Sequence, residues 1–410
     1  MPGPGDRVAG VSPGARARRV CVIGAGAAGL ACAERLRALS ADVSITVVDA
    51  DADQPYNRPP LSKDVLSGRV GATEARLRSD EQLAELRIDL RAGTPVEQVD
   101  TTTRTVVTKD EPVPYDDLVL APGCTPVTPW HESAPWIRTL HSLADVRVLR
   151  DDLVLPSRVV IVGGGLIGLE AAAVLRGLGH GVVVVEAGEG PLQRIVGPQV
   201  AAWMEGRHRK EGVEFELGRR VVAVSGSAHA GVVTLDDGRR VDGDVVVCAV
   251  GVRPATQWLV GSGVELGSRG EILADERLRT TAPDVWAAGD AVSWPSASAE
   301  RRLRVEHWTC AREQGRHVAE QLLAADAAQT AAFDTVPYFW SSQYGALLQG
   351  AGSFHGDEVI VDGPSTSLDS LVARYLTGGR LTGVLTVGSP RTFQELRSRL
   401  PGGRPTTAAT

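Results

Sequence analysis

The sequence predicts an α/β fold in which two similar βαβ units are followed by a smaller C-terminal α+β domain. A Gly-rich turn occurs twice, within RVCVIGAGAAGL at residues 19–30 and RVVIVGGGLIGL at residues 158–169. Each copy follows a β-branched apolar run, which suits a buried parallel strand, and runs into an Ala/Leu-rich helical stretch. After residue 330 the pattern changes to gathered aromatic residues and alternating β-like segments.

The composition is that of a globular protein with more than one domain. The chain has 410 residues, 43% of them hydrophobic and 23% charged, and 410 residues suggest two to three domains. No apolar run approaches the ~20 residues that would cross a bilayer, so no membrane association is expected. The 43 basic and 50 acidic residues give a net charge of −7, which argues against general nucleic-acid binding. Residues 1–18 lack an apolar signal-peptide core and are expected to be a disordered tail.

The cysteine pattern points to a reducing compartment. The five cysteines show no Cys-x-x-Cys and no zinc-type spacing, so no metal site is expected. So few cysteines suit a reducing environment, and a cytoplasmic location is therefore expected. Cys21, Cys32 and Cys248 lie within apolar runs and are predicted to be buried small hydrophobes.

Each Gly-rich turn lies inside a complete βαβ unit. The first unit continues with a predicted helix at Ala31–Leu39 and a strand at Ile45–Val48, and the second with a helix at Glu170–Leu178 and a strand at Val182–Val185. Two such units imply two nucleotide-sized sites. Further strands are expected at Asp117–Leu120, Gly243–Val250 and Asp284–Ala288, and, in the C-terminal domain, at Glu358–Val361 and Leu381–Val387.

The first turn has the spacing of a phosphate-binding loop. Gly24 permits the tight turn, Gly26 lets backbone approach a pyrophosphate, and Gly29 allows close helix–strand packing. The helix N-terminus, with Ala27 and Ala28, supplies N–H donors. Asp49, about 20 positions on, is the acidic residue expected to hold a ribose hydroxyl.

The second turn repeats this geometry with Gly163, Gly165 and Gly168, and with Leu166 and Ile167 between them. Glu186 stands in the ribose position. A carboxylate there accepts hydrogen bonds from a free 2′-hydroxyl and repels a 2′-phosphate, so NADH is expected over NADPH. Arg194 is close enough in sequence to moderate this preference.

With both loops in place, further motifs resemble those of the FAD-dependent pyridine nucleotide oxidoreductases. Within that superfamily the chain is similar to the oxygenase-coupled ferredoxin reductases, such as the putidaredoxin and rhodocoxin reductases. The matching segments are Pro55–Lys63 (PYNRPPLSK), Leu118–Gly123 (LVLAPG), Val246–Pro254 (VVCAVGVRP), Val285–Val292 (VWAAGDAV), Glu306–Trp308 (EHW) and Pro337–Tyr344 (PYFWSSQY). Four positions depart from the usual pattern: Asp49 for Glu, Pro122 for Thr, and Asn57 and Ser342 for acidic residues.

The resemblance implies a glutathione-reductase-like arrangement of domains. Residues 19–124 and 247–328 would form a discontinuous FAD-binding domain, residues 125–246 the NAD-binding domain, and residues 329–410 the C-terminal domain. Catalytic roles would fall on Lys63, Glu170 and Trp340. Besides the two loops and their acidic residues, cofactor contacts would come from Arg58, Lys63, Ala121, Gly123, Gly251, Asp290, Trp308 and Trp340.

Physical chemistry supports these roles and leaves simpler ones open. Lys63 beside a flavin would stabilise the negative charge that develops as a hydride arrives, and Glu170 would hold its ammonium in place. Alternatively, Arg58 and Lys63 are solvated loop charges and Glu170 is a first-turn helix acid. Asp290 could be an N-cap. Further alternatives make Trp308 and Trp340 domain-interface core and His307 purely structural.

No cysteine occurs between Arg58 and Leu66, so the thiol relay of the disulfide reductases has no place in that segment. A [2Fe-2S] ferredoxin serving an oxygenase is then the expected electron acceptor. Alternatives are a redox-signalling or structural flavoprotein and a flavoenzyme acting directly on a small molecule. An acidic ferredoxin needs a basic patch, for which Arg301, Arg302 and Arg304 are candidates. The oligomeric state is left open between monomer and homodimer.

Overall fold

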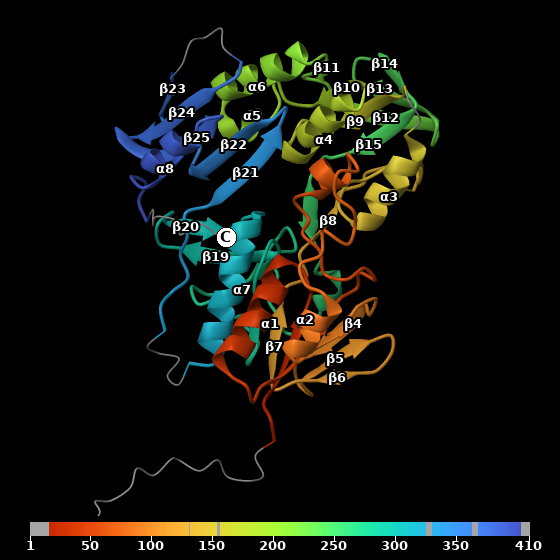
Figure 1. The fold of residues 1–410 in the computed structure, drawn as a ribbon. Coiled ribbons are helices and arrows are strands. Elements are labelled where there is room, and N and C mark those ends of the chain that lie inside the picture. The colour runs from red at the N-terminus through yellow and green to blue at the C-terminus, as the bar shows by residue number, and fades with distance from the viewer. Residues whose placement is uncertain (1–15, 131, 154–155, 325–329, 363–367, 403–410) are drawn as a thin grey trace, which may run out of the picture.

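The structure is a computed structural model, and it describes residues 16–130, 132–153, 156–324, 330–362 and 368–402. Most of the predicted N-terminal tail, residues 1–15, lies outside this range. Three parts of the molecule can be followed by colour in Figure 1. The red, orange and cyan segments form the lower part, the yellow and green segments the upper right, and the blue segments the upper left. The predicted class, α/β with an additional C-terminal domain, is confirmed.

The lower part contains a five-stranded parallel sheet in the order β18-β7-β1-β2-β3. Its strands are β1 (Arg19–Ile23), β2 (Ser44–Val48), β3 (Ile88–Arg91), β7 (Asp117–Leu120) and β18 (Val285–Ala287). β18 comes from late in the chain, so this sheet is built from two separate stretches of sequence. Helices α1 (Ala27–Leu39) and α7 (Trp308–Leu322) pack along each other (Figure 1). They come so close that a Cβ on Gly315 would lie 2.0 Å from the Ala28 carbonyl oxygen.

The upper right part contains a four-stranded parallel sheet in the order β11-β10-β9-β15. Its strands are β9 (Arg158–Val162), β10 (Gly181–Glu186), β11 (Glu214–Leu217) and β15 (Val245–Cys248), with α4 (Leu166–Gly177) and α6 (Pro198–Lys210) beside it. All four residues of β15 pair with β9. β15 is therefore part of this sheet.

The C-terminal part is a five-stranded antiparallel sheet in the order β21-β22-β25-β24-β23, with α8 packed against β25 and β22. The elements are β21 (Tyr338–Gln343), β22 (Ala346–Gly352), β23 (Glu358–Asp362), β24 (Leu371–Thr377), β25 (Arg380–Val387) and α8 (Pro390–Arg397). β21 also contacts α4, so the C-terminal sheet reaches the second βαβ unit (Figure 1).

Smaller elements connect these parts. The remaining helices are η1, a short π-helical turn (Leu61–Val65), α2 (Asp80–Glu85), α3 (Leu143–Asp152), α5 (Gln193–Val196) and the 3₁₀ turn η2 (Gln257–Leu259). The remaining strands are β4 (Val96–Asp100), β5 (Thr105–Thr108), β6 (Val113–Pro114), β8 (Cys124–Pro126), β12 (Val221–Ser227), β13 (Ala230–Leu235), β14 (Arg240–Gly243), β16 (Val252–Pro254), β17 (Ile272–Leu273), β19 (Val292–Ser296) and β20 (Arg301–Leu303).

The predicted elements differ from the observed ones mainly at their ends. Both βαβ helices begin four residues earlier than predicted, at Ala27 and Leu166, because Gly26 and Gly165 are their N-caps. The strand at Asp117–Leu120 is confirmed. The run at Gly243–Val250 is not one strand, since β14 ends at Gly243 and β15 begins at Val245.

The cysteines are buried and the described helices are too short or too polar to span a membrane. Cys21, Cys32 and Cys248 are buried, as predicted, and so are Cys124 and Cys310. Among the described residues, no helix is both long and apolar enough to cross a bilayer.

Candidate functional site

The helix starts that follow the two Gly-rich turns line one cavity. Its walls include Ala27 and Ala28 from the first turn of α1, and Leu166 and Ile167 from the first turn of α4. The cavity has a volume of about 300 Å³, at the lower end of the range of small-molecule sites. The starts of two βαβ helices therefore face the same space.

In the first loop each glycine has a separate structural role. Gly24 has a φ of +99°, and a Cβ there would lie 2.1 Å from the Ala121 carbonyl oxygen. A Cβ on Gly29 would lie 1.8 Å from the carbonyl oxygen of Gly24. A Cβ on Gly26 would meet no atom within 4 Å. Two glycines are thus required for packing, whereas the third borders open space.

The second loop repeats this pattern. Gly163 has a φ of +112°, and a Cβ there would lie 2.3 Å from the Ala249 carbonyl oxygen. A Cβ on Gly168 would lie 2.1 Å from the Gly163 carbonyl oxygen, whereas one on Gly165 would meet nothing within 4 Å. The open position therefore recurs at the same place in both loops.

A carboxylate is anchored beside each loop. Asp49 accepts hydrogen bonds from the backbone N–H groups of Ala25, at 2.7 Å, and Asp51, at 3.0 Å, and burial raises its pKa. Glu186 accepts from the N–H groups of Gly164 and Gly188, both at 2.7 Å.

A buried ion pair lies in the cavity wall between the loops. The Lys63 Nζ lies 2.6 Å from Oε2 of Glu170, and their side chains are 13% and 6% exposed. Lys63 also donates to the Pro59 carbonyl at 3.0 Å. Glu170 accepts a further hydrogen bond from Ser62 on Oε2, and one from Ser341 on Oε1 at 2.6 Å. Lys63 is therefore not a solvated loop charge, because its ammonium is fixed at the cavity.

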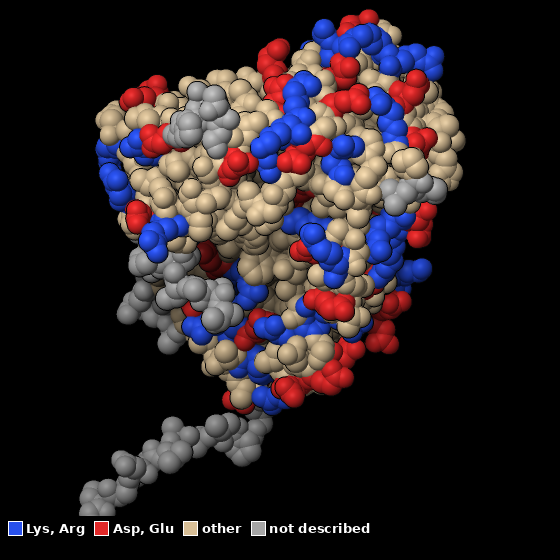
Figure 2. Space-filling view, turned by 45° about the horizontal axis from the view of Figure 1, so that its top comes forward, with Lys and Arg blue, Asp and Glu red and all other residues tan. Residues whose placement is uncertain are grey.

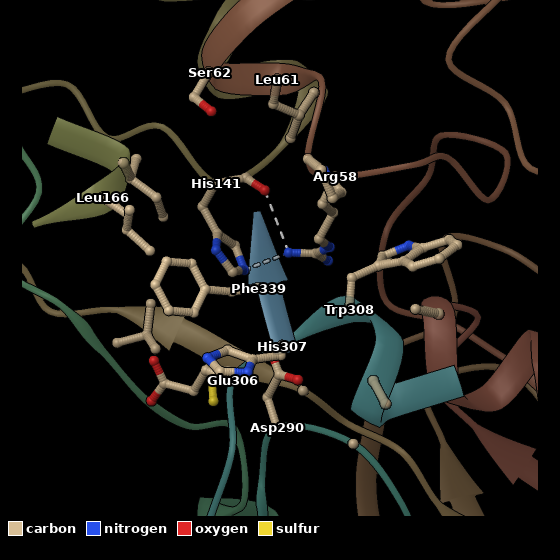
Figure 3. A pocket seen from close by; sticks show the side chains of 18 of the residues that line it. Arg58, Leu61, Ser62, His141, Leu166, Asp290, Glu306, His307, Trp308 and Phe339 are labelled. Atoms are coloured by element: carbon tan, nitrogen blue, oxygen red, sulfur yellow. Dashed lines mark hydrogen bonds between the residues drawn. The ribbon is translucent and has the colours of Figure 1, made fainter. Parts of the chain in front are cut away.

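Charged side chains gather on another wall (Figure 3). Arg58 extends toward His141 and contacts both its ring and its backbone carbonyl. Burial, followed by the charge of Glu306, raises the pKa of Asp290 to about 6. Asp290 lies between β18 and β19 and caps no helix, so the N-cap interpretation is wrong. Arg304 bonds the Asp290 carbonyl at 2.9 Å and pairs with Glu306 at 2.6 Å.

Aromatic residues close the remaining side of the cavity. Trp308 begins α7 and meets Trp340 of β21 edge to face, with ring centroids 5.9 Å apart. His307 packs against Phe339, and burial lowers its pKa to about 4, which keeps its ring neutral. The buried His307 Nδ1 and Trp308 Nε1 have no hydrogen-bond partner among the described residues. His307 and Trp308, which both line the cavity, thus each carry one ring nitrogen without a hydrogen bond (Figure 3).

These features fit two dinucleotides that meet at their reactive ends. At Gly26 and Gly165 the backbone leaves room where a pyrophosphate would lie, and each helix N-terminus directs N–H groups there. The unpaired polar atoms of His307 and Trp308 suit a heteroaromatic ring with its own donors and acceptors. The residues therefore fit FAD at the first loop and a nicotinamide dinucleotide at the second.

The predicted site residues divide into two groups by position. Those lining the cavity are Ala27, Ala28, Arg58, Lys63, Ala121, Gly123, Leu166, Ile167, Glu170, Asp290, Trp308 and Trp340. Those outside its lining are Gly24, Gly26, Gly29, Asp49, Gly163, Gly165, Gly168, Glu186, Arg194 and Gly251. Most of the second group form the two loops. Arg194 is exposed on α5, and Gly251 is exposed with a φ of +113°.

The candidate basic patch does not present three free arginines. Arg302 donates to the Ala274 carbonyl at 2.8 Å and also to Ser293, so it fastens the chain. Arg304 is engaged with Asp290 and Glu306 at the cavity. An arginine run in sequence does not show which guanidinium groups the fold itself uses.

Sequence reasoning overlooked several residues at the site. His141 carried no signal, because it lies in a connection without a motif. Ser62 and Ser341 stood inside the quoted motifs, but their hydrogen bonds to Glu170 depend on three segments meeting. Further lining residues that were not predicted are Tyr56, Pro59, Leu61, Cys124, Leu140, Val252, Gly289, Glu306, Ala311 and Phe339.

Comparison with known families gives two matches. Residues 18–315 match the family described as "Pyridine nucleotide-disulphide oxidoreductase", and residues 338–410 match "Reductase C-terminal". The first match alone covers more than half of the chain.

Individual relatives agree with the family match. The chain is 35% identical to human "Apoptosis-inducing factor 3" over 94% of its own length, but spans only 63% of that relative. It is 32% identical to the "Benzene 1,2-dioxygenase system ferredoxin--NAD(+) reductase subunit" of Pseudomonas putida, covering 92% of this chain and 91% of the relative. The solved covalent complex of putidaredoxin reductase with putidaredoxin contains a chain 31% identical, with a TM-score of 0.86 and 94% of each chain covered.

Proposed function

Because the chain belongs to the pyridine nucleotide-disulphide oxidoreductase family, we propose that it is an NADH-dependent, FAD-containing ferredoxin reductase. One observation carries the proposal: the starts of both βαβ helices line a single cavity whose wall holds the Lys63–Glu170 ion pair, with little of either side chain exposed. The relative that serves a benzene dioxygenase system supports a [2Fe-2S] ferredoxin of an oxygenase as the acceptor.

The two loops divide the binding between the cofactors. The N–H groups at the start of α1 hold the pyrophosphate of FAD, and Asp49 accepts from its ribose. The start of α4 binds the pyrophosphate of NADH in the same way. Glu186, held by Gly164 and Gly188, faces the adenosine ribose and disfavours the 2′-phosphate of NADPH.

When bound, FAD accepts a hydride from the nicotinamide and releases the two electrons singly to a one-electron acceptor. This chain supplies the electrostatics of the reaction. The Lys63 ammonium is held at the cavity by Glu170 and provides fixed positive charge where negative charge develops. The N-terminus of α7 also lies at the cavity, with Trp308 as its first helical residue, and adds the positive end of a helix dipole. Trp308, Trp340 and Phe339 exclude water.

A basic surface beside the cavity suits an acidic partner. The Arg312 guanidinium lies 4.7 Å from the ring centroid of Trp308. Burial and the nearby charges of Arg316 and Arg78 lower the pKa of Arg312, whereas Glu34, which pairs with Arg78 at 2.8 Å, raises it, so three positive charges and one negative charge lie close together. Figure 2 shows a hollowed face with acidic and basic side chains both around the hollow. The cluster formed by Arg78, Arg312 and Arg316, with one of its charges offset by Glu34, is a local basic feature on a chain with a net charge of −7.

The test follows the flavin and the electrons separately. The protein is purified, loaded with FAD and mixed anaerobically with NADH, which should bleach the flavin absorbance. Cytochrome c reduction is then measured with and without an added [2Fe-2S] ferredoxin, and it should be fast only with it. Arg316→Glu, at an exposed position of the cluster, should slow the ferredoxin-dependent rate at low salt without changing flavin bleaching. Failure to bind FAD, or no gain on adding any of several ferredoxins, would contradict the proposal.

The likeness to apoptosis-inducing factor 3 favours one competing function, a redox-signalling flavoprotein. Such a protein would bind both nucleotides at the same loops but would not pass electrons rapidly to a ferredoxin. The cytochrome c assay separates the two, because ferredoxin-dependent turnover is expected of only one of them. Rapid NADH consumption without any protein acceptor would instead favour direct action on a small molecule.

A further inference from the structure

A line of buried polar side chains leads from the Lys63–Glu170 pair toward the C-terminal domain. Ser341 lies 2.6 Å from Oε1 of Glu170, and Gln343 Nε2 lies 3.0 Å from the Ser341 Oγ. Gln343 Oε1 is 2.9 Å from Nε2 of His208, whose Nδ1 is 2.7 Å from the Tyr344 hydroxyl. The exposures of Ser341, Gln343 and His208 are 0%, 7% and 0%.

With the Gln343 amide oriented as in the structure, the chemistry of these groups gives the direction of every hydrogen bond. An ionised Glu170 can only accept, so Ser341 must donate to it. The Ser341 oxygen then accepts from the Gln343 amide, whose own oxygen accepts from the Nε2–H of His208. The Nδ1 of His208 is left to accept from Tyr344. All four donors therefore point toward Glu170, and the line ends at the carboxylate that holds Lys63.

The surroundings of His208 agree with this direction. Burial lowers its pKa to about 4, so the ring is neutral and has one donor and one acceptor nitrogen. The ring packs edge to face against Tyr344 and Phe215, with centroids 5.0 Å and 6.1 Å away. The positive charge of Arg207, whose guanidinium lies 5.2 Å from the Tyr344 ring centroid, further disfavours an imidazolium.

We propose that Ser341, Gln343 and His208 are positioning residues that orient Glu170, and through it Lys63, so that the C-terminal domain sets the charge at the reaction centre. This inference rests on the proposed function, because it assigns the Lys63 charge to hydride transfer. The three residues come from β21 of the C-terminal domain and α6 beside the second sheet. Aligned hydrogen bonds in a buried line polarise one another, so the distal members act on Glu170 through Ser341.

The first experiment measures graded effects along the line in the FAD-loaded protein. Ser341→Ala removes the donor to Glu170 and should slow NADH-driven flavin bleaching about tenfold, with the KM for NADH unchanged. Gln343→Met keeps the side-chain volume and should slow bleaching less, about threefold. Both variants should lower the flavin midpoint potential, because Lys63 is then held less firmly at the position where its charge stabilises the reduced cofactor. Ser342→Ala changes the exposed neighbour on the same strand and is the matched control.

A double-mutant cycle tests whether the effect passes through Glu170. In a Glu170→Gln background, Ser341→Ala should add little, because the charged acceptor is already gone. Equal slowing in both backgrounds, or an unchanged potential in Ser341→Ala, would overturn the inference.

The second experiment uses the protein without cofactor and needs no turnover. Nitrogen-15 NMR of the imidazoles should show His208 as the Nε2–H tautomer, neutral down to about pH 5. The Nδ1–H tautomer would reverse the line and refute the inference. If NADH fails to bleach the wild-type flavin, the proposed function fails independently of this result. If the wild type is bleached and Ser341→Ala is indistinguishable from it, only the positioning role fails.

Discussion

Replacing Gly165 with Ala should weaken NADH binding while leaving FAD bound and the fold intact. Gly165 has φ −75° and ψ 179°, which Ala adopts without strain, and its added Cβ would meet no protein atom within 4 Å. The methyl group would stand where the pyrophosphate approaches the α4 N-terminus. Loss of one backbone hydrogen bond to a charged group costs about 1.5–3 kcal/mol, so the KM for NADH should rise about 10- to 100-fold.

The same change in the first loop should weaken FAD binding instead of NADH binding. Gly26→Ala, at φ −72°, should release FAD, whereas Gly165→Ala should stay yellow. Both proteins should melt within about 2 °C of the wild-type apoprotein, since an N-cap Gly→Ala change costs well under 2 kcal/mol in a chain of this size. Gly168→Ala is the contrasting control, because its Cβ would lie 2.1 Å from the Gly163 carbonyl oxygen and should destabilise the fold. An unchanged KM in Gly165→Ala would show that the second loop does not bind the nucleotide.

Further predictions concern catalysis, specificity and pH. Lys63→Met should retain FAD and slow anaerobic bleaching of the flavin by about 100-fold, because it removes a fixed charge that stabilises the transition state by a few kcal/mol. Complete loss of FAD would instead assign Lys63 to cofactor binding. The wild type should use NADH with a kcat/KM at least about tenfold above that for NADPH, and equal values would show that Glu186 does not face the ribose. Burial lowers the pKa values of His141, His208 and His307 from 6.5 to about 4. Between pH 6.5 and pH 4 the unfolded chain therefore binds more protons than the folded protein, and the free energy of unfolding falls as the pH drops through this range. The pKa of Asp290 is raised to about 6, so this carboxyl group releases its proton on unfolding and partly offsets the histidines. Urea unfolding near pH 5 should therefore take up roughly two protons net. A free energy of unfolding that does not change between pH 6.5 and pH 4 would contradict the burial of these rings.

The sequence predicted the parts of the fold that depend on local pattern. The two βαβ units follow from β-branched runs and glycine spacing, because both signals lie within about 30 residues. Strand β15 shows the limit, since Val245–Cys248 reads as part of a longer run and only pairing with β9 shows where it belongs. Helix starts were displaced because Gly26 and Gly165 carry no capping side chain that could mark them.

At the site, the motifs identified charged residues more readily than the groups that orient them. Lys63 lies in one of the motifs and Glu170 directly follows the second Gly-rich turn, and the resemblance to the family implied that the two lie close together. Ser341 and Gln343 occupy a motif as well, but a serine or glutamine in a strand is most often a surface residue. Their burial follows from β21 packing against α4, a contact between elements that no local pattern predicts.

The position of the C-terminal sheet gives the molecule a physical reason to keep this third part. An isolated pair of nucleotide-binding units would leave Oε1 of Glu170 without its 2.6 Å donor, since Ser341 belongs to β21. A carboxylate that loses a hydrogen bond is held less firmly in one orientation. Lys63, which bonds to Glu170, would then be held less firmly at the position that the Pro59 carbonyl and Glu170 together define. The C-terminal sheet therefore contributes to the reaction centre through Ser341 as well as through Trp340 in the cavity wall.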